Sequence, residues 1–549
     1  RCYALRRVAR PGFAPTTRLR AGPSPKERIV PISSLRRPEA IHSADDAEAA
    51  LRELLRQAGL DAPHADRPDW NPFGAYVRPG GTVFVLPNLV QHRLPRETAA
   101  QFRAKCTDGP LVAAIVALAR RAVGPAGRVL VGCAPIQSCV WERVIADTGL
   151  AAALAASTAN AVRAATDAAN ASDDRAHATA SGAHGTTDIE DAPTDAANAS
   201  DDRAPAKPDG IHATPDATPD APSDISLDQA RDDAPRDASP AKRPAPQAEL
   251  VDLRGWISTL HRSGRIIGAP NPDAPTPVAV DLGADSALDE LPPGAHFRVA
   301  DYDHRRTEAC HGRGRHLYLL HPAPLAADLV ISVPKIKTHS KVGATLAVKG
   351  CVGTVEHKDC LAHHRRGDPR DGGDEFPRAN PLLALASWAQ DHRGAAMQIV
   401  GAAARAAAKR LGARGEGSWG GNDTAWRMAV DLARIVAYAA ADGTMHDEPQ
   451  RRHVAIYDGL VAGEGEGPLR PTPVEAGTLV FADDVLAGDR FVAAAMGFAP
   501  SWPPVVAARL QSERWPLESS GAEAHEGDAP QLIAGRPFVP PPGWSLAPR

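Results

Sequence analysis

The sequence predicts an α/β fold, a layered, mostly parallel sheet with helices on both faces, interrupted by a long disordered insertion. Short runs of Val, Ile and Leu recur between Pro, Gly and Asp, which is typical of strands covered on both faces. Helical patterns separate several of these runs, and that alternation favours a parallel sheet. One long stretch has almost no large aliphatic side chains, so it cannot contribute to a packed core.

The predicted strands are near-continuous apolar runs, and the predicted helices are longer segments with helical periodicity. The expected strands cover residues 82–86, 128–131, 248–253, 328–333, 453–457 and 478–481. The expected helices cover about 109–124, 140–149, 379–413, 424–441 and 486–496.

The insertion is predicted to span residues 155–247. No Phe, Tyr or Trp occurs between Trp141 and Trp256, and the text is dominated by Ala, Asp, Thr, Pro and Ser. Such a segment buries too little apolar surface to offset the entropy of ordering it. The block at residues 166–176 recurs at residues 194–204, which indicates expansion of low-complexity sequence.

The remaining boundaries follow from composition. Residues 1–26 are expected to be a disordered or extraneous extension, because the first stretch is rich in Arg and has no acid. Residues 27–154 form the first part of the α/β domain, residues 248–510 form the remainder, and residues 511–549 are a Pro-rich tail.

Composition excludes several classes of function. A net charge of −4 gives no electrostatic footprint for nucleic acid or for an anionic membrane. No apolar run is long enough to span a membrane. The 7 cysteines are scattered and include no Cys-x-x-Cys, which favours free thiols in a reducing cytoplasm and gives no reason to expect an iron–sulfur cluster. Oligomeric state is left open.

The lysines point to a candidate site. The chain has ten lysines, and five of them lie between Lys335 and Lys358. Arginine is permanently charged and planar, whereas lysine offers a compact charge and an amine whose pKa moves on burial. A chain that uses arginine almost everywhere else therefore needs the amine or the point charge in this segment.

The cluster begins where a buried strand ends, which is where ligands gather in open α/β sheets. Lys335, Lys337 and His339 alternate, so an extended chain would project them from one side, suited to a phosphate or carboxylate. Lys349 follows a mostly apolar run and precedes glycines. It is either partly buried, with a lowered pKa suited to base or nucleophile work, or it extends to solvent.

A polar loop follows the lysine cluster. Adjacent His363 and His364 precede Arg365, and Asp374 and Glu375 come after a pair of glycines. These side chains are candidates for substrate binding or, for the two acids, for a divalent metal. Their spacing matches no zinc pattern, so a mobile active-site loop is the alternative.

Two further clusters complete the candidate set. Asn422 and Asp423 precede Thr424 in a loop that reads as a helix N-cap, and Arg427 follows one turn later. The segment from Asp458 to Pro468 is glycine-rich and is predicted to be a turn after a strand. Its carboxylates, Glu464 among them, suit counter-charges or cation ligands better than a phosphate loop.

These motifs, in order, resemble DUF362, a family named as a domain of unknown function. The resemblance rests on Lys335-x-Lys337-Thr338-His339, Lys349, His363-His364-Arg365, Asp374-Glu375, Asn422-Asp423, Arg427, Asp458, Gly463-Glu464-Gly465 and Asp489. It runs from about residue 82 to 150 and from 248 to about 505, and it looks like the branch found beside polysaccharide genes. No settled activity follows from it.

The chain departs from that pattern at three positions. Leu86-Pro87-Asn88 stands where Lys-Pro-Asn is usual, Cys133 replaces an aspartate, and Gly350 replaces an asparagine. A fainter similarity is to the lactate racemase N-terminal domain, which places a histidine ten residues before a lysine. It would make His339 an acid/base, Lys349 the tether of a nickel-pincer nucleotide, and His363 or His364 a neighbour of the metal.

The leading hypothesis is a cytoplasmic enzyme, an isomerase or transferase, acting on an anionic small molecule of sugar or nucleotide-sugar type. Lys335 and Lys337 would hold the anion, His339 would move protons, and Lys349 would do the chemistry. The alternative is a non-catalytic binding or assembly protein. The remaining candidates are, for substrate, Asn88, Thr338, His363, His364, Arg365, Asn422, Asp423, Arg427, Gly463, Glu464 and Gly465, and, for a metal, Asp374, Glu375 and Asp458.

Overall fold

The computed structural model describes residues 32–36, 43–159, 163, 248–260, 266–299, 304–392, 395–507, 514–517, 529–533 and 535–548. The predicted extension at residues 1–26 lies outside the described residues. So does the predicted insertion at 155–247, apart from residues 155–159 and residue 163. Residues 150–159 are helical, so ordered structure continues a few residues past the predicted boundary.

One large mixed sheet carries the fold, and it confirms the α/β prediction. Neighbours are parallel from β15 to β4, whereas β17 is antiparallel to both β1 and β15. All six predicted strands are present. The strand order is β1 (Ile32–Arg36), β17 (Thr478–Ala482), β15 (Arg452–Glu464), β11 (Leu329–Val333), β2 (Thr82–Pro87), β3 (Arg128–Cys133) and β4 (Glu249–Asp252).

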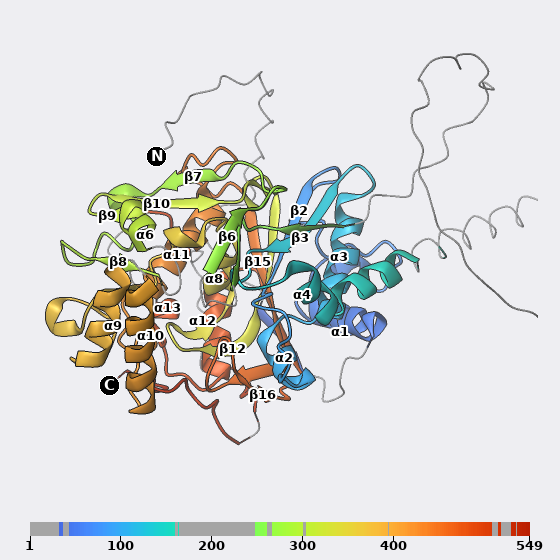
Figure 1. The fold of residues 1–549 in the computed structure, drawn as a ribbon. Helices are drawn as coiled ribbons and strands as arrows, with labels where there is room; N and C mark the ends of the chain where they lie inside the picture. The colour runs from blue at the N-terminus through green and yellow to red at the C-terminus, as the bar shows by residue number, and fades with distance from the viewer. Residues whose placement is uncertain are drawn as a thin grey trace, which may run out of the picture. The chain divides into compact units, whose positions relative to one another are not determined.

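Helices cover both faces of this sheet, as predicted (Figure 1). On one face, α3 (Gly109–Val123) packs on β2 and β3, and α1 (Ala44–Gln57) packs on α3. On the other lie α8 (Ala347–Gly350), α11 (Ala425–Tyr438) and α12 (Val485–Ala495). The strands between them are apolar and buried along their length because both faces are covered.

Strand β15 is much longer than predicted, and its second half carries three short strands. β12 (Lys335–His339) is parallel to it, β16 (Thr472–Val474) is antiparallel to it, and β13 (Gly343–Thr345) pairs with β12. The turn predicted for residues 458–468 is therefore wrong for residues 458–464, which belong to β15, whereas residues 465–468 form the bend and turn that follow it. Glycine is needed there for close packing, since a Cβ on Gly459 would lie 2.9 Å from Ile336, and one on Gly463 would lie 2.7 Å from Pro471.

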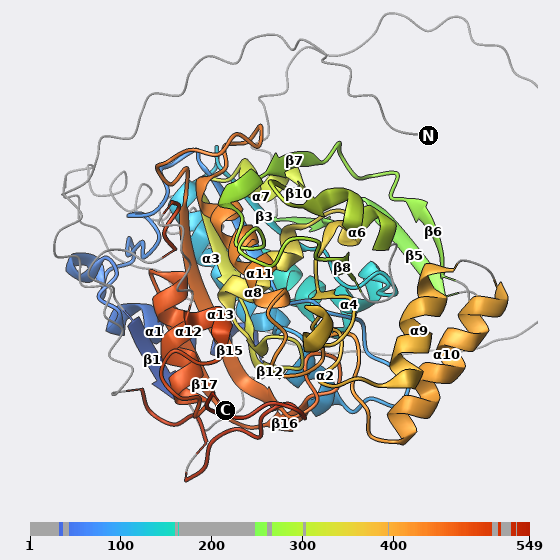
Figure 2. The same cartoon turned by 90° about the vertical axis from the view of Figure 1, so that its left-hand side faces the viewer.

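The other predicted helices are present, with one difference. The segment expected as a single helix is a hairpin of α9 (Pro381–Asp391) and α10 (Ala395–Arg410), which stands at one side of the molecule (Figure 2). The remaining helices are α2 (Ala99–Lys105), α4 (Trp141–Asp147), α6 (His304–Cys310), α7 (Pro322–Leu325) and α13 (Pro504–Ala507).

Smaller strand pairs lie outside the main sheet. β7 (Val278–Asp281), β10 (Arg315–Leu320) and β9 (His311–Gly312) form one sheet. β14 (His364–Arg365) pairs with β8 (Phe297–Arg298), and β5 (Trp256–Leu260) pairs with β6 (Ile266–Pro270).

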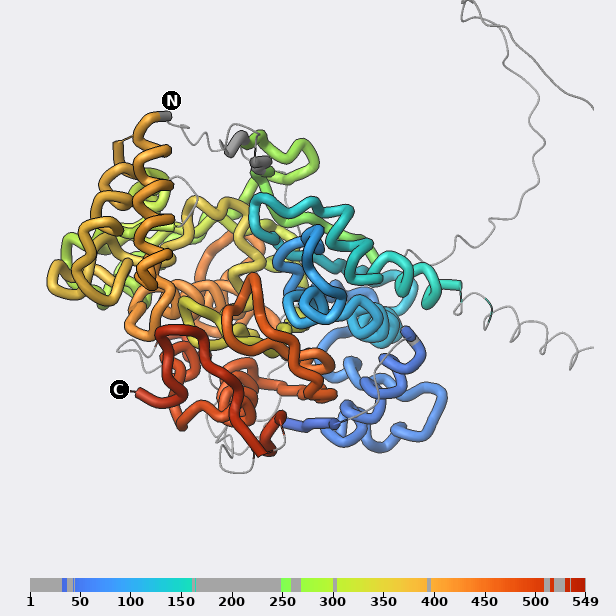
Figure 3. Tube along the Cα trace, turned by 60° about the horizontal axis from the view of Figure 1, so that its bottom comes forward, coloured from blue at the N-terminus to red at the C-terminus, as the bar shows by residue number. Residues whose placement is uncertain are grey.

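The C-terminal Pro-rich segment packs on the domain in its described part. Phe538 and Trp544 are buried, and the Trp544 indole donates a hydrogen bond to the carbonyl of Ser340 at 2.7 Å. In the tube view the C-terminal segment lies near the first strand, which pairs with β17 (Figure 3). Within the described residues no helix is long and apolar enough to cross a membrane. The six cysteines in that part are free thiols.

Candidate functional site

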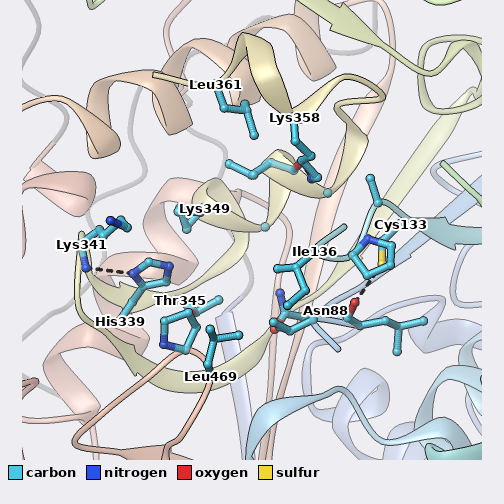
Figure 4. A pocket seen from close by; sticks show the side chains of 18 of the residues that line it. Asn88, Cys133, Ile136, His339, Lys341, Thr345, Lys349, Lys358, Leu361 and Leu469 are labelled. Atoms are coloured by element: carbon cyan, nitrogen blue, oxygen red, sulfur yellow. Dashed lines mark hydrogen bonds between the residues drawn. The ribbon is translucent and has the colours of Figure 1, made fainter. Parts of the chain in front are cut away.

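A cavity of about 570 Å³ lies beyond the carboxyl ends of β2, β3 and β12. One side comes from the loop after β2 (residues 87–90) and the loop after β3 (residues 133–138). The other side comes from the end of β12, from α8 and from the two short 3₁₀ turns that follow α8, with Lys341, His339 and Lys349 grouped together (Figure 4). Ligand cavities of this size, at this edge of a sheet, are usual in α/β proteins.

Lys349 reaches this cavity because α8 is held in place by a buried carboxylate. Asp489 on α12 accepts hydrogen bonds from the backbone N–H groups of Ala347 and Val348 at 2.8 and 2.9 Å, and from the Tyr457 hydroxyl at 2.7 Å. The carboxylate thus satisfies the free N–H groups at the start of the helix. Burial raises the pKa of Asp489 to about 7.

The Lys349 amine is buried without a counter-charge. The residue is 8 % exposed, and among the described residues its amine has no hydrogen-bond or ion-pair partner. Burial, aided by nearby Lys341, lowers the pKa of Lys349 to about 8. At acidic pH such a lysine is a cation without a neighbouring anion. Just above neutrality a large share of the amine is neutral and can act as a base or nucleophile.

Lys358, on the second turn after α8, is a second such amine. It is 6 % exposed, and among the described residues its amine donates one hydrogen bond, to the carbonyl of Val352 at 2.8 Å. Burial lowers the pKa of Lys358 to about 7. Across the cavity, burial raises the pKa of the Cys133 thiol to about 12, so Cys133 is neutral and offers no charge to Lys358.

His339, at the end of β12, is held neutral and in a defined tautomer. The Lys341 backbone N–H donates to its Nδ1 at 3.1 Å (Figure 4). Because Nδ1 accepts, the proton of the neutral ring sits on Nε2. Burial, together with Lys349 and other nearby lysines, places the pKa of His339 well below its ordinary value. The Lys341 amine contacts the carbonyl of Glu416, which also lines the cavity.

His363 lines the same cavity, and its loop is tied down by Asn422. The Asn422 amide donates to the carbonyls of His363 and Gly417 at 2.9 and 2.8 Å, and its oxygen accepts from the N–H groups that begin α11. Burial and the three lysines nearby place the pKa of His363 well below its ordinary value. Asn422 therefore holds the backbone of the loop that carries His363, without lining the cavity itself.

Lys335 and Lys337 lie beneath the cavity and do not line it. The Lys335 amine pairs with Asp458 of β15 at 2.7 Å, and both side chains are fully buried. The Lys337 amine donates to the side chain of Asn88 at 2.7 Å and also contacts the carbonyl of Lys105. Burial lowers the pKa of Lys337 to about 7. Protein groups thus occupy both lysines, whereas Asn88 itself lines the cavity.

The candidate metal ligands do not meet. Asp374 accepts from the Thr424 hydroxyl and from the Arg365 backbone and side chain, and Glu375 accepts from Gly367 and Ser387. Asp458 is in the buried ion pair. In the described part of the chain, no group of three or more His, Cys, Asp or Glu side chains is arranged to hold a metal ion. Lys349, His339 and His363, on which the similarity to the lactate racemase domain rests, line the cavity. The described residues around them include no group of metal ligands.

The remaining candidates are distributed around the site. Glu464 forms an ion pair with Arg536 at 2.8 Å and accepts from the N–H of Val539, and Thr338 donates to the carbonyl of Gly465. Gly463 is packed within β15 and His364 within β14. Arg427 on α11 forms ion pairs with Asp423, which lies just before that helix, and with Glu290, which follows β7 in the chain.

Sequence reasoning missed the contribution of the strand-end loops. Leu89, Val90, Pro135 and Ile136 line the cavity, as do Leu361 and Leu469. A usable signal was present, because β2 and β3 were both predicted and ligand sites gather beyond the ends of parallel strands. Lys341 and Lys358 also line the cavity, although neither is among the candidate site residues of the sequence analysis.

Comparison with known proteins identifies one domain. Residues 253–494 match the model of the family described as a domain of unknown function, DUF362. The match includes the cavity-lining residues that follow β11 and excludes the loops after β2 and β3. No curated protein and no solved structure matches the chain.

Proposed function

We propose that the DUF362 domain of this protein, together with the preceding part of the sheet, binds an anionic small molecule in this cavity. One observation carries the proposal: Lys349 and Lys358 are buried in the cavity wall without a carboxylate partner among the described residues. Burying uncompensated charge is costly, and an anion in the cavity would offset that cost.

Each lining group has a role in this proposal. Lys349 and Lys358 hold the anion, and the Nε2–H of neutral His339 is available as a hydrogen-bond donor or proton carrier. Lys349, with a pKa of about 8, is also suited to act as base or nucleophile, because its amine has no hydrogen-bond partner among the described residues, whereas that of Lys358 donates to Val352. A sugar phosphate or nucleotide sugar fits this level of description, since its phosphate would meet the same amines.

The first test is calorimetric titration with sulfate at about pH 6.5. We expect Lys349→Gln and Lys358→Gln each to raise the Kd for sulfate by about tenfold, because each removes a charge-assisted hydrogen bond of roughly 1.5–3 kcal/mol. Lys409→Gln on α10 is the matched control, because Lys409 is exposed and lies outside the cavity. Equal Kd values for the wild type and both cavity variants would refute the proposal.

The pH dependence of sulfate binding has a predicted sign. Sulfate keeps its charge, so the change comes from the protein. The pKa values of Lys358 and Lys349, about 7 and about 8, lie below that of free lysine, so both amines lose their protons as the pH rises through this range. We expect the Kd to rise by at least about tenfold from pH 6 to pH 9. The histidines stay neutral throughout and add nothing to the change. A flat profile in Kd would show that these amines do not hold the anion.

A non-catalytic binding protein is the second candidate. Cys133 and Gly350, two positions where the chain departs from the expected Asp and Asn, both line the cavity. A Cβ on Gly350 would meet no atom within 4 Å, so a side chain can begin there without a close contact. If the cavity binds anions but catalyses nothing, Cys133→Asp with Gly350→Asn is the variant in which to look for turnover.

A further inference from the structure

The two sides of the cavity differ in chemistry, and this difference narrows the class of ligand. The amines and imidazoles that line the cavity come from the end of β12 and from the segment that follows it. The opposite side has no charged side chain among the described lining residues. The loops after β2 and β3 contribute the apolar residues Pro87, Leu89, Val90, Ala134, Pro135 and Ile136, beside the neutral polar residues Asn88, Gln137 and Ser138 and the thiol of Cys133. Figure 4 shows Ile136 and Cys133 across from Lys349 and His339. Charge is therefore concentrated on one side only.

The lining has neutral hydrogen-bonding side chains but lacks the large aromatic side chains that often recognise sugars and bases. Among the described residues that line the cavity there is no Phe, Tyr or Trp, and the aromatic rings are the imidazoles of His339 and His363. Glu416 is the one carboxylate among those residues, and its own backbone is engaged by Lys341. The hydroxyl groups of a sugar placed against Leu89, Val90 and Ile136 would lose their hydrogen bonds to water, and in these loops only Asn88, Gln137 and Ser138 offer side-chain replacements.

We propose that the ligand is an anion with an aliphatic body: a phosphate, sulfate or carboxylate head held by Lys349 and Lys358, and a saturated hydrocarbon portion against Ile136 and its neighbours. This inference rests on the proposed function and deepens it. Leu361 and Leu469 extend the apolar lining, and Leu469 is 41 % exposed, which leaves an apolar side chain in water until a ligand covers it.

The test is calorimetry with alkyl sulfonates, whose charge does not change with chain length. We expect the Kd to fall by about fourfold for each methylene group added from methanesulfonate to hexanesulfonate, as burial of a methylene group predicts. Glucose 6-sulfate should bind no more tightly than methanesulfonate. Ile136→Ser should weaken hexanesulfonate binding by about fivefold or more and leave methanesulfonate binding unchanged. Ile399→Ser on α10, where the side chain is 70 % exposed, is the matched control and should change neither.

The outcomes separate this inference from the proposed function. Equal Kd values across the sulfonates, or tighter binding of glucose 6-sulfate than of hexanesulfonate, would overturn the aliphatic ligand and leave the anion site standing. Failure of sulfate and every sulfonate to bind would overturn both. The chain-length series uses the wild-type protein, so it decides the matter even if Ile136→Ser does not fold.

Discussion

Replacing Lys335 by Met lowers the free energy of unfolding by about 3–5 kcal/mol, the usual cost of leaving a buried charge without its partner. Lys335 and Asp458 are both fully buried, and their charged atoms are 2.7 Å apart. A second carboxylate, Asp108, is close by, since its backbone N–H donates to Asp458 at 2.8 Å. Burial and the charge of Asp458 raise the pKa of Asp108. Without the lysine, two buried carboxylates would face each other.

Urea denaturation measures this effect, and two controls make it specific. In the double variant Lys335→Met with Asp458→Asn the unpaired charge is gone, so at least about 1 kcal/mol of stability should return. Arg128→Gln breaks an exposed ion pair with Glu249 on neighbouring strands, and it should cost less than about 1 kcal/mol. If Lys335→Met were as stable as Arg128→Gln, the ion pair would not be the structural element that we describe.

Lys349 is expected to react with cyanate at about pH 7 roughly tenfold to a hundredfold faster than an ordinary exposed lysine. Only the neutral amine reacts, and an ordinary lysine with a pKa of about 10.4 is almost wholly protonated at this pH. Burial lowers the pKa of Lys349 to about 8, so a much larger share of this amine is neutral.

Peptide mass spectrometry after timed exposure gives the rate at each lysine. Lys409 serves as the exposed reference within the same chain. Saturating sulfate should slow the modification of Lys349 and leave that of Lys409 unchanged, because a bound anion favours the protonated amine. Equal rates at the two lysines would show that the Lys349 amine does not have the lowered pKa, or that cyanate does not reach it through the cavity. Intact mass of the untreated chain also detects any cofactor tethered to Lys349.

The sheet could be predicted from sequence because its central strands are buried on both faces. Runs such as residues 328–333 are then apolar throughout, and the helices between them have clear periodicity. Of the glycine-rich segment at residues 458–468, predicted to be a turn, residues 458–464 are strand and residues 465–468 are bend and turn. Glycine allows both a turn and close packing within a strand, and the sequence does not say which neighbours will approach.

The candidate site could be predicted only in part. Lys349, His339, His363 and Asn88, which the sequence singles out, line one cavity, and their functional roles stay predictions. The alternation of Lys335, Lys337 and His339 along β12 does not tell which of these side chains lines the cavity and which is paired with another protein group. That separation depends on Asp458 in β15 and on Asn88 after β2, which are distant in sequence and pair with Lys335 and Lys337. The apolar residues of the cavity likewise come from the loops after β2 and β3, which are distant in sequence from the lysines.

The most direct test of the anion site is a crystal structure with selenate, located by the anomalous scattering of selenium. The account predicts a selenium peak in the cavity, with selenate oxygens within hydrogen-bonding distance of the amines of Lys349 and Lys358, and loss of that peak in the Lys349→Gln, Lys358→Gln double variant. An empty cavity at a selenate concentration well above the Kd for sulfate, or a peak that survives in the double variant, would contradict it.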